Sequence, residues 1–173
     1  MTSTQLPFRS LLLLGSFLGL FLLHGCISAT DPGEEEEEYN PDFSTVPEPF
    51  DTTGAQRTDL DNGVIYYTIR EGEGVFQVVY RDQLSLYFTL RTADGTILSS
   101  SYADSSTSPR LVRVADLTTQ GMISGILGMK VDEQRTLIVP PALGYGDVSE
   151  SDPNYPYRND TLIYDLEVAF ISQ

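Results

Sequence analysis

The side chains that proteins use most often for nucleophilic and acid–base chemistry are scarce in this chain. Its 173 residues contain one histidine and one cysteine, His24 and Cys26, and both follow an uncharged apolar run. One imidazole and one thiol cannot supply the four nitrogen and sulfur ligands of a usual zinc site. If the N-terminal stretch is removed, Ser-His-Asp and Cys-His catalysis are excluded as well. The chemistry of this protein therefore has to come from other side chains.

Charge and spacing exclude further kinds of site. Segment 59–63 looks slightly like a calcium loop, but it has Gly63 at the fifth position and Arg70 where the closing Glu belongs. The chain has 10 basic and 25 acidic residues, a net charge of −15, whereas nucleic-acid binding needs cationic groups facing phosphates. We therefore expect no metal, no cofactor and no nucleic-acid partner.

Residues 1–25 have the pattern of an export signal. Arg9 precedes the uncharged run Leu11–Leu23, whose 13 residues would form a helix too short for the hydrocarbon core of a membrane. That length is typical of a signal peptide. The four residues that follow, Leu23-His24-Gly25-Cys26, resemble the lipobox of bacterial lipoprotein signals, in which the cysteine is lipidated and the chain is cut just before it.

The lipobox resemblance implies a membrane partner and a location. Lipidated Cys26 would anchor the protein in the bacterial cell envelope, since several acyl chains on one residue hold firmly. Position 27 is Ile rather than Asp, which by analogy with that family favours the outer membrane, on its periplasmic or surface side. The alternative is an ordinary secretory signal cut near Ala29, which would leave the cysteine unmodified.

Residues 26–52 are predicted to form an acidic tether. From position 27 onward this segment has nine acidic residues, no basic ones and four prolines, and it includes five consecutive glutamates at 34–38. Charge repulsion and proline keep such a segment extended and unable to build a core. We expect a disordered spacer that lifts the following domain off the membrane, with a tail for a cation or a basic partner as the alternative.

Residues 53–173 predict one α+β domain. Met122, Ile123, Ile126 and Leu127 have helical spacing on one apolar face, which predicts a short helix packed on a sheet. Runs rich in β-branched and aromatic residues, bounded by turn signals, predict strands. These runs cover residues 64–69, 75–80, 84–90, 96–98, 111–114, 135–139 and 161–172.

Motifs that follow one another along this domain resemble the FK506-binding proteins, the FKBP-type peptidyl-prolyl isomerases. The strongest match is Gly125 to Arg135, which continues into Ile138 to Gly146. Weaker matches lie at residues 63–69, 72–74, 86–89, 94–95, 99–101 and 159–168. The resemblance spans about residues 58–173. It implies an antiparallel sheet of five or six strands wrapped around one short helix, with the substrate pocket between helix and sheet.

The resemblance also implies the residues of that pocket. Tyr145 matches the family's loop tyrosine, while the other pocket positions carry different residues from the family's. Tyr145, through its hydroxyl, and Thr119, through its backbone N–H, are the implied donors to a bound peptide. The implied walls are Phe88, Leu98, Met122 and Tyr164, and Ser99 stands where the family has an aspartate.

The reaction implied by the family needs neither histidine nor cysteine. The barrier to rotation of an X–Pro peptide bond is about 18–20 kcal/mol, and it reflects amide resonance that is lost in the twisted state. A dry pocket favours this less polar state, and one donor that holds a neighbouring carbonyl fixes an end of the peptide. We expect a monomeric isomerase that acts on proline-containing unfolded or exported polypeptides. The alternatives are a non-catalytic peptide-binding chaperone that keeps only the fold, and a purely structural lipoprotein.

Overall fold

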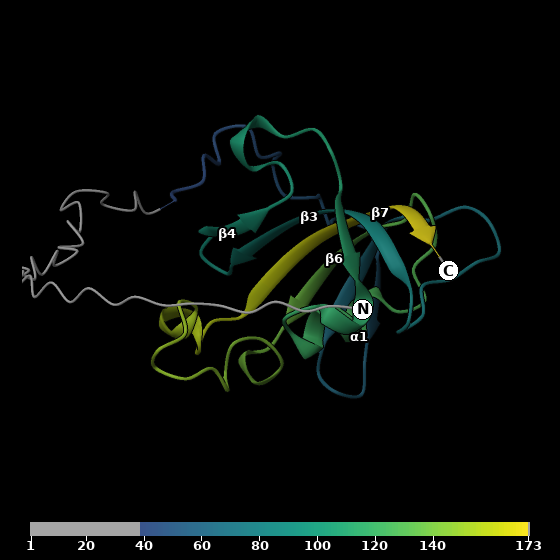
Figure 1. Ribbon diagram of the computed structural model, residues 1–173. Coiled ribbons are helices and arrows are strands. Elements are labelled where there is room, and N and C mark those ends of the chain that lie inside the picture. The colour runs from purple at the N-terminus through teal and green to yellow at the C-terminus, as the bar shows by residue number, and fades with distance from the viewer. Residues whose placement is uncertain (1–38, 173) are drawn as a thin grey trace, which may run out of the picture. The chain divides into compact units, whose positions relative to one another are not determined.

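The structure, a computed structural model, describes residues 39–172 and contains one antiparallel sheet with a short helix on one face (Figure 1). The strands are β1 (Gln56–Asp59), β2 (Ile65–Arg70), β3 (Gln83–Thr92), β4 (Ile97–Ser100), β5 (Arg110–Arg113), β6 (Gln134–Val139) and β7 (Leu162–Ser172). The helix is α1 (Gln120–Ile126), and single 3-10 turns are η1 (Ala103–Ser105), η2 (Val114–Asp116), η3 (Pro141–Leu143) and η4 (Tyr155–Tyr157).

The seven strands follow the order β1-β2-β6-β7-β3-β4, and β5 also pairs with β3. Strand β4 pairs with Thr89–Arg91 and β5 with Gln83–Leu86, so the two short strands share one edge of β3 end to end. The expected α+β fold with an antiparallel sheet around one short helix is confirmed, with more strands than the five or six expected.

None of the helices in the described part of the chain has the length and apolarity that crossing a bilayer requires.

Alternation along the long strands builds the core. On β3, Leu84, Leu86 and Leu90 are buried toward α1, and on β7 Leu166 and Val168 are buried with them. Side chains at alternate positions of a strand point to opposite faces, so the leucines of β3 lie on one face and Ser85, Thr89 and Arg91 on the other. The sheet therefore has an inner face, packed against the helix, and an outer face.

Helix α1 lies unusually close to β6. A Cβ atom added at Gly121 would come within 2.1 Å of Val139 Cγ1, and one added at Gly125 within 2.5 Å of Leu137 Cδ1. Glycine lowers helix propensity, which is why the sequence alone indicates a weak helix here. The structure shows why glycine is needed here: without side chains at these two positions, the helix backbone packs directly on the side chains of the strand.

Arg135 of β6 fixes the C-terminal end of this helix. Its Nη1 donates to the carbonyl oxygens of Gly125 at 2.9 Å and Leu127 at 3.2 Å, which the helix leaves without partners. Its Nε donates to Glu133 Oε1 at 2.6 Å in a buried ion pair, and its guanidinium lies 4.2 Å from the ring centre of Tyr66. The strongest motif of the sequence thus connects helix to sheet.

The strand predicted at residues 75–80 is wrong. These residues form a loop between β2 and β3, and Val75 and Phe76 are 86% and 61% exposed. Val78 is anchored to another loop: its N–H donates to Met129 O at 2.8 Å, and its carbonyl accepts from Gly128 N at 3.0 Å. Val79 N donates to Asp82 Oδ2 at 2.9 Å. The apolar run has no neighbouring strand to pair with, so it meets another loop instead.

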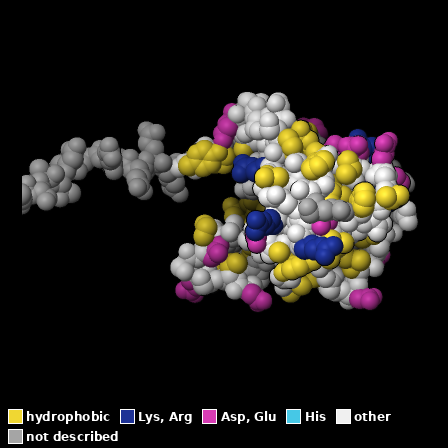
Figure 2. Space-filling model, turned by 45° about the vertical axis from the view of Figure 1, so that its right-hand side comes forward, with side chains coloured by type: hydrophobic (Ala, Val, Ile, Leu, Met, Phe, Trp, Pro, Cys, Tyr) yellow, Lys and Arg dark blue, Asp and Glu magenta, His cyan; other side chains and the backbone are white. Residues whose placement is uncertain are grey.

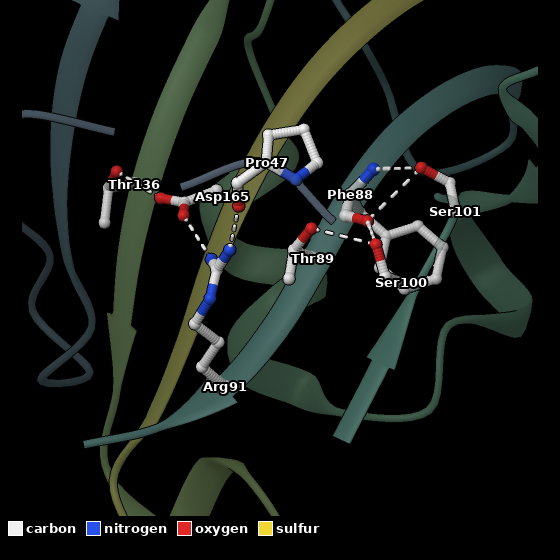
Figure 3. Close-up of polar contacts among 8 residues, drawn as sticks. All are labelled: Pro47, Phe88, Thr89, Arg91, Ser100, Ser101, Thr136 and Asp165. Atoms are coloured by element: carbon white, nitrogen blue, oxygen red, sulfur yellow. Dashed lines mark hydrogen bonds and ion pairs between the residues drawn. The ribbon is translucent and has the colours of Figure 1, made fainter. Parts of the chain in front are cut away.

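The compact unit begins at Tyr39, not at residue 53 where the sequence places the domain boundary. The hydroxyl of Tyr39 donates to the carboxylate of Asp104, and the backbone N–H of Asp42 donates to the same carboxylate at 2.8 Å. Pro47 O accepts from Arg91 Nη2 at 2.7 Å (Figure 3). Residues 39–50, called the N-terminal strap below, therefore follow the domain surface instead of forming a free spacer. The predicted signal peptide, Cys26 and the glutamate run lie outside the described residues.

Candidate functional site

A cavity of about 530 Å³ opens between α1 and the inner face of the sheet. Its walls come from β3, β4, β5, the segment before α1, the helix itself, the loop after η3, and β7. The lining residues are Gln83, Phe88, Leu90, Ser99, Arg110, Leu111, Val112, Arg113, Asp116, Leu117, Thr118, Met122, Tyr145 and Tyr164. The cavity lies where the sequence analysis expects the pocket, between helix and sheet.

Five of the seven predicted site residues line this cavity together: Phe88, Ser99, Met122, Tyr145 and Tyr164. They come from β3, β4, α1, the loop after η3 and β7, so segments far apart in the sequence converge here. Met122 projects from the first turn of α1, and the aromatic rings surround the space beside it. The structure thus assembles most of the predicted walls.

Leu98 does not line the cavity, contrary to prediction. The pairing of β3 with β4 shifts register at this point: Leu90 lies opposite Ser99 and Arg91 opposite Ile97, so Leu98 is the extra residue of a β-bulge. It lines a neighbouring shallow cavity with residues of the N-terminal strap, including Pro41 and Phe43. Ser99, the next residue, reaches both cavities.

The side chain of Thr119 is also occupied elsewhere. Thr119 precedes α1 and caps it, because its Oγ1 accepts from Met122 N at 3.3 Å. The same Oγ1 lies 3.0 Å from the hydroxyl of Tyr164 in a buried hydrogen bond. Its neighbour Thr118 lines the cavity instead. The role predicted for the backbone N–H of Thr119 stays a prediction.

The two tyrosine hydroxyls of the cavity differ in their partners. The Tyr164 hydroxyl is bonded to Thr119, which fixes the ring as a wall. The Tyr145 side chain is 6% exposed, yet among residues 39–172 its hydroxyl has no hydrogen-bond partner. No buried side-chain oxygen or nitrogen of the described chain lacks a partner, so this hydroxyl is reached from the cavity. Tyr145 can therefore donate to a ligand without breaking an existing bond.

Burial keeps both hydroxyls protonated. It raises the pKa of Tyr145, with a smaller contribution from the charge of Asp152. Burial raises the pKa of Tyr164 further, and the hydrogen bond with Thr119 offsets this only in part. A phenol with a raised pKa stays neutral and able to donate across the physiological pH range.

The loop that carries Tyr145 is held by backbone hydrogen bonds. After Pro140, the turn η3 leads into Gly144 and Gly146, whose N–H groups both donate to Pro141 O, at 3.0 and 2.8 Å. These bonds fold the chain back toward the sheet at the end of β6. The turn formed by these bonds holds the backbone on both sides of Tyr145, which lines the cavity.

Sequence reasoning missed several polar and charged residues of the cavity, above all Arg110 and Asp116. A signal was present, since alternation along residues 110–113 places Arg110 and Val112 on the same face of a strand. Within residues 39–172, no group of three or more His, Cys, Asp or Glu side chains is placed to hold a metal ion. The site is a cavity with aromatic and aliphatic walls, an available tyrosine hydroxyl, and several polar and charged side chains in its lining.

Comparisons with known proteins agree with this geometry. The family model described as FKBP-type peptidyl-prolyl cis-trans isomerase matches residues 76–169. FK506-binding protein 2 of Dictyostelium discoideum is 34% identical over 126 residues, which cover 70% of this chain and 87% of that protein.

Two solved structures share the fold. A peptidyl-prolyl cis-trans isomerase from Pseudomonas syringae superposes with a TM-score of 0.55 at 19% identity, covering 70% of this chain and 88% of that one. FkpA from Escherichia coli does so with a TM-score of 0.55 at 22% identity, covering 67% and 51%. Sequence, fold and cavity therefore agree: the chain belongs to the family of FKBP-type peptidyl-prolyl cis-trans isomerases, a class of isomerase enzymes.

Proposed function

We propose that the cavity accelerates cis–trans exchange of X–Pro bonds in exported or unfolded polypeptides, with Tyr145 as the donor to the substrate. The observation that carries this proposal is Tyr145, a largely buried residue that lines the cavity and whose hydroxyl is accessible there and has no partner among the described residues. Proline fits such a space because its ring is apolar and its nitrogen carries no hydrogen to be satisfied.

The mechanism follows from polarity and positioning. A planar amide is dipolar, whereas the twisted transition state has lost this resonance, so a cavity walled by Phe88, Met122 and Tyr164 favours the twisted state. Tyr145 would hold the carbonyl next to the X–Pro bond while the rest of the peptide rotates. No proton is transferred and no covalent bond is broken, which agrees with a site made of rings, a thioether and one hydroxyl.

The test is exchange of a Leu-Pro peptide, measured by NMR with residues 39–173 and with the Tyr145→Phe variant. The substitution keeps the ring and removes the donor. We expect kcat/KM to fall about 5- to 30-fold, the range for one hydrogen bond in a dry site. Tyr80→Phe is the matched control, because Tyr80 is exposed and does not line the cavity.

Two results would contradict the proposal. Equal activity of the Tyr145→Phe variant and the wild type would remove the role of the hydroxyl. A wild-type protein that binds proline peptides without accelerating exchange would favour the second candidate, a peptide-binding chaperone. That candidate has an observation in its favour, because Phe76 and Tyr80 expose 61% and 57% of their surface on the loop before β3.

We further propose that the protein is anchored in the bacterial cell envelope through a lipid on Cys26. The support is the pattern Leu23-His24-Gly25-Cys26 after 13 uncharged residues. Export would bring the isomerase to polypeptides that fold outside the cytoplasm. Cells given radiolabelled fatty acid should label the wild-type protein and not the Cys26→Ser variant. Equal labelling of both proteins would contradict the anchor.

A further inference from the structure

Arg110 places a positive charge on the wall of the cavity. In the pairing of β3 with β5, Arg110 lies directly opposite Leu86, a fully buried residue of the inner face. Residues opposite each other in an antiparallel pair have their side chains on the same face of the sheet. Arg110 therefore belongs to the inner face, and it lines both the cavity and the shallow cavity under the strap, as Ser99 does.

The Arg110 guanidinium is not engaged by the protein. Four other arginines of the described chain form ion pairs, whereas within residues 39–172 no hydrogen bond or ion pair involves the Arg110 side chain. The nearby acid is Asp104, whose carboxylate already accepts from the Tyr39 hydroxyl and from Asp42 N. These two bonds, Tyr39 first, lower the pKa of Asp104, and Arg110 adds only a smaller electrostatic contribution.

Two other charged residues, Arg113 and Asp116, also line the cavity, so its wall carries two positive charges and one negative charge. Of the two arginines, Arg110 lies opposite buried Leu86 on the inner face, whereas Arg113 lies opposite Gln83. The cavity wall thus has a net positive charge, in a protein whose net charge is −15. On the face drawn in Figure 2, basic side chains lie toward the centre, beside a hollow, and acidic side chains lie mostly around the outline.

We propose that Arg110 selects substrates with an aspartate or glutamate next to the proline. A planar guanidinium binds a carboxylate through paired hydrogen bonds, and Arg110 lines the same cavity as the walls expected to hold the proline ring, so it can meet a residue adjacent to that proline. This inference rests on the proposed function, because it names the class of peptide that the same cavity prefers.

The test compares peptides that differ by one charge. Peptides of the type Ala-Glu-Pro-Phe and Ala-Gln-Pro-Phe place the acid before proline, and a second pair, Ala-Pro-Glu-Phe and Ala-Pro-Gln-Phe, places it after. We expect kcat/KM for exchange to be about 2- to 5-fold higher for the glutamate member of one pair, the range that one solvent-exposed ion pair provides. This ratio should shrink toward 1 in about 0.5 M salt, which screens exposed charges.

Three variants assign the preference to Arg110. Arg110→Gln should bring the glutamate-to-glutamine ratio to about 1, and Arg110→Lys should retain part of it. Arg81→Gln is the control: it removes the same charge from an exposed position outside the cavity, and the ratio should stay as in the wild type. A ratio of 1 for the wild type in both pairs overturns the inference, as does a ratio that survives in Arg110→Gln.

Failure of the inference and failure of the proposed function remain distinguishable. Exchange of all four peptides at equal rates would leave the isomerase function and remove the charge preference. If no peptide is turned over, the proposed function fails. The same pairs are then titrated for binding by NMR shift changes, where tighter binding of the glutamate peptides by wild type, lost in Arg110→Gln, supports the role of Arg110, and equal binding overturns it.

Discussion

The polar groups on the outer face of the sheet and those that line the cavity on its inner face differ in their hydrogen-bond partners. On the outer face, Arg91 Nη1 donates to Asp165 Oδ2 at 2.6 Å, and Thr136 Oγ1 donates to Asp165 Oδ1 at 2.7 Å (Figure 3). Thr89 Oγ1 lies 3.0 Å from Ser100 Oγ beside them. On the inner face, leucines and valines form the core, and the Tyr145 hydroxyl lacks a partner among the described residues.

This difference separates structural polar groups from those available to a ligand. The outer polar residues are buried and bonded to one another, and Pro47 O of the strap completes the partners of Arg91. A network with all partners in place stabilises one arrangement and leaves nothing for a ligand to bind. Several polar side chains that line the cavity, among them Tyr145 and Arg110, have no side-chain partner within residues 39–172 and are open to a ligand.

The largest expected loss of stability comes from a substitution that removes the ion pair of the outer-face network. Arg91→Met removes the charged partner of Asp165, whose side chain is 7% exposed, and leaves a buried carboxylate with Thr136 alone. Loss of one partner from a buried pair costs about 3–5 kcal/mol of unfolding free energy. Urea unfolding followed by circular dichroism measures this loss.

Arg57→Gln provides the comparison for that measurement. Arg57 pairs with Asp59 at 2.6 Å on edge strand β1, but both side chains are more than half exposed, at 51% and 61%. We expect no measurable change in stability, because exposed pairs gain little. A similar loss in both variants would show that burial does not distinguish the two pairs.

A smaller effect should follow from removing the strap. A chain that starts at residue 53 lacks Pro47 O, the acceptor of the 2.7 Å bond from Arg91. A lost hydrogen bond to a charged group costs about 1.5–3 kcal/mol, so this chain should unfold at lower urea than one that starts at Tyr39. Equal midpoints would instead support the domain boundary that the sequence suggests, at residue 53.

The smallest expected effect is that of pH on kcat/KM, which depends on the residues of the cavity on the inner face. Because His24 and Cys26 lie outside the cavity-forming domain, no group of the site titrates near neutrality, and kcat/KM should stay level from about pH 6 to 9. The raised pKa of Tyr145 and Tyr164 acts only at higher pH. Above about pH 10 the tyrosines of the unfolded chain ionise before these two do, so stability should fall there.

The activity near neutral pH and the stability at high pH can be measured separately. NMR exchange gives the rate without a coupled protease, whose own pH dependence would interfere. Thermal unfolding between about pH 8 and 11 gives the stability. A rate that changes by more than about twofold between pH 6 and 9 would indicate a titrating group that the site does not contain.

The sequence predicts the parts of this fold that depend on periodicity. Alternation defines the long strands β3 and β7, and the motif around Arg135 places helix and sheet together. The prediction from side-chain type is wrong at residues 75–80, where strand-forming side chains have no strand to pair with. The prediction that Leu98 lines the cavity is wrong for a related reason. A bulge in the pairing of β3 with β4 turns this residue away, and local sequence does not specify the register of that pairing.

The site shows the same limit. Tyr145 could be found because the motif Ile138 to Gly146 resembles the family's motif and keeps its loop tyrosine. Arg110 depends on which residue of β3 lies opposite it, a long-range property. The occupied hydroxyl of Thr119 likewise depends on Tyr164, which is 45 residues away.

The close packing of the α1 backbone on β6 depends on residues other than those that give the cavity its chemistry. Gly121 and Gly125 allow the close approach of helix and strand, whereas Met122 between them lines the cavity. Wall residues can therefore be exchanged while the glycines keep this approach. Related enzymes could acquire new substrate preferences one side chain at a time, while the scaffold that orients the peptide stays the same.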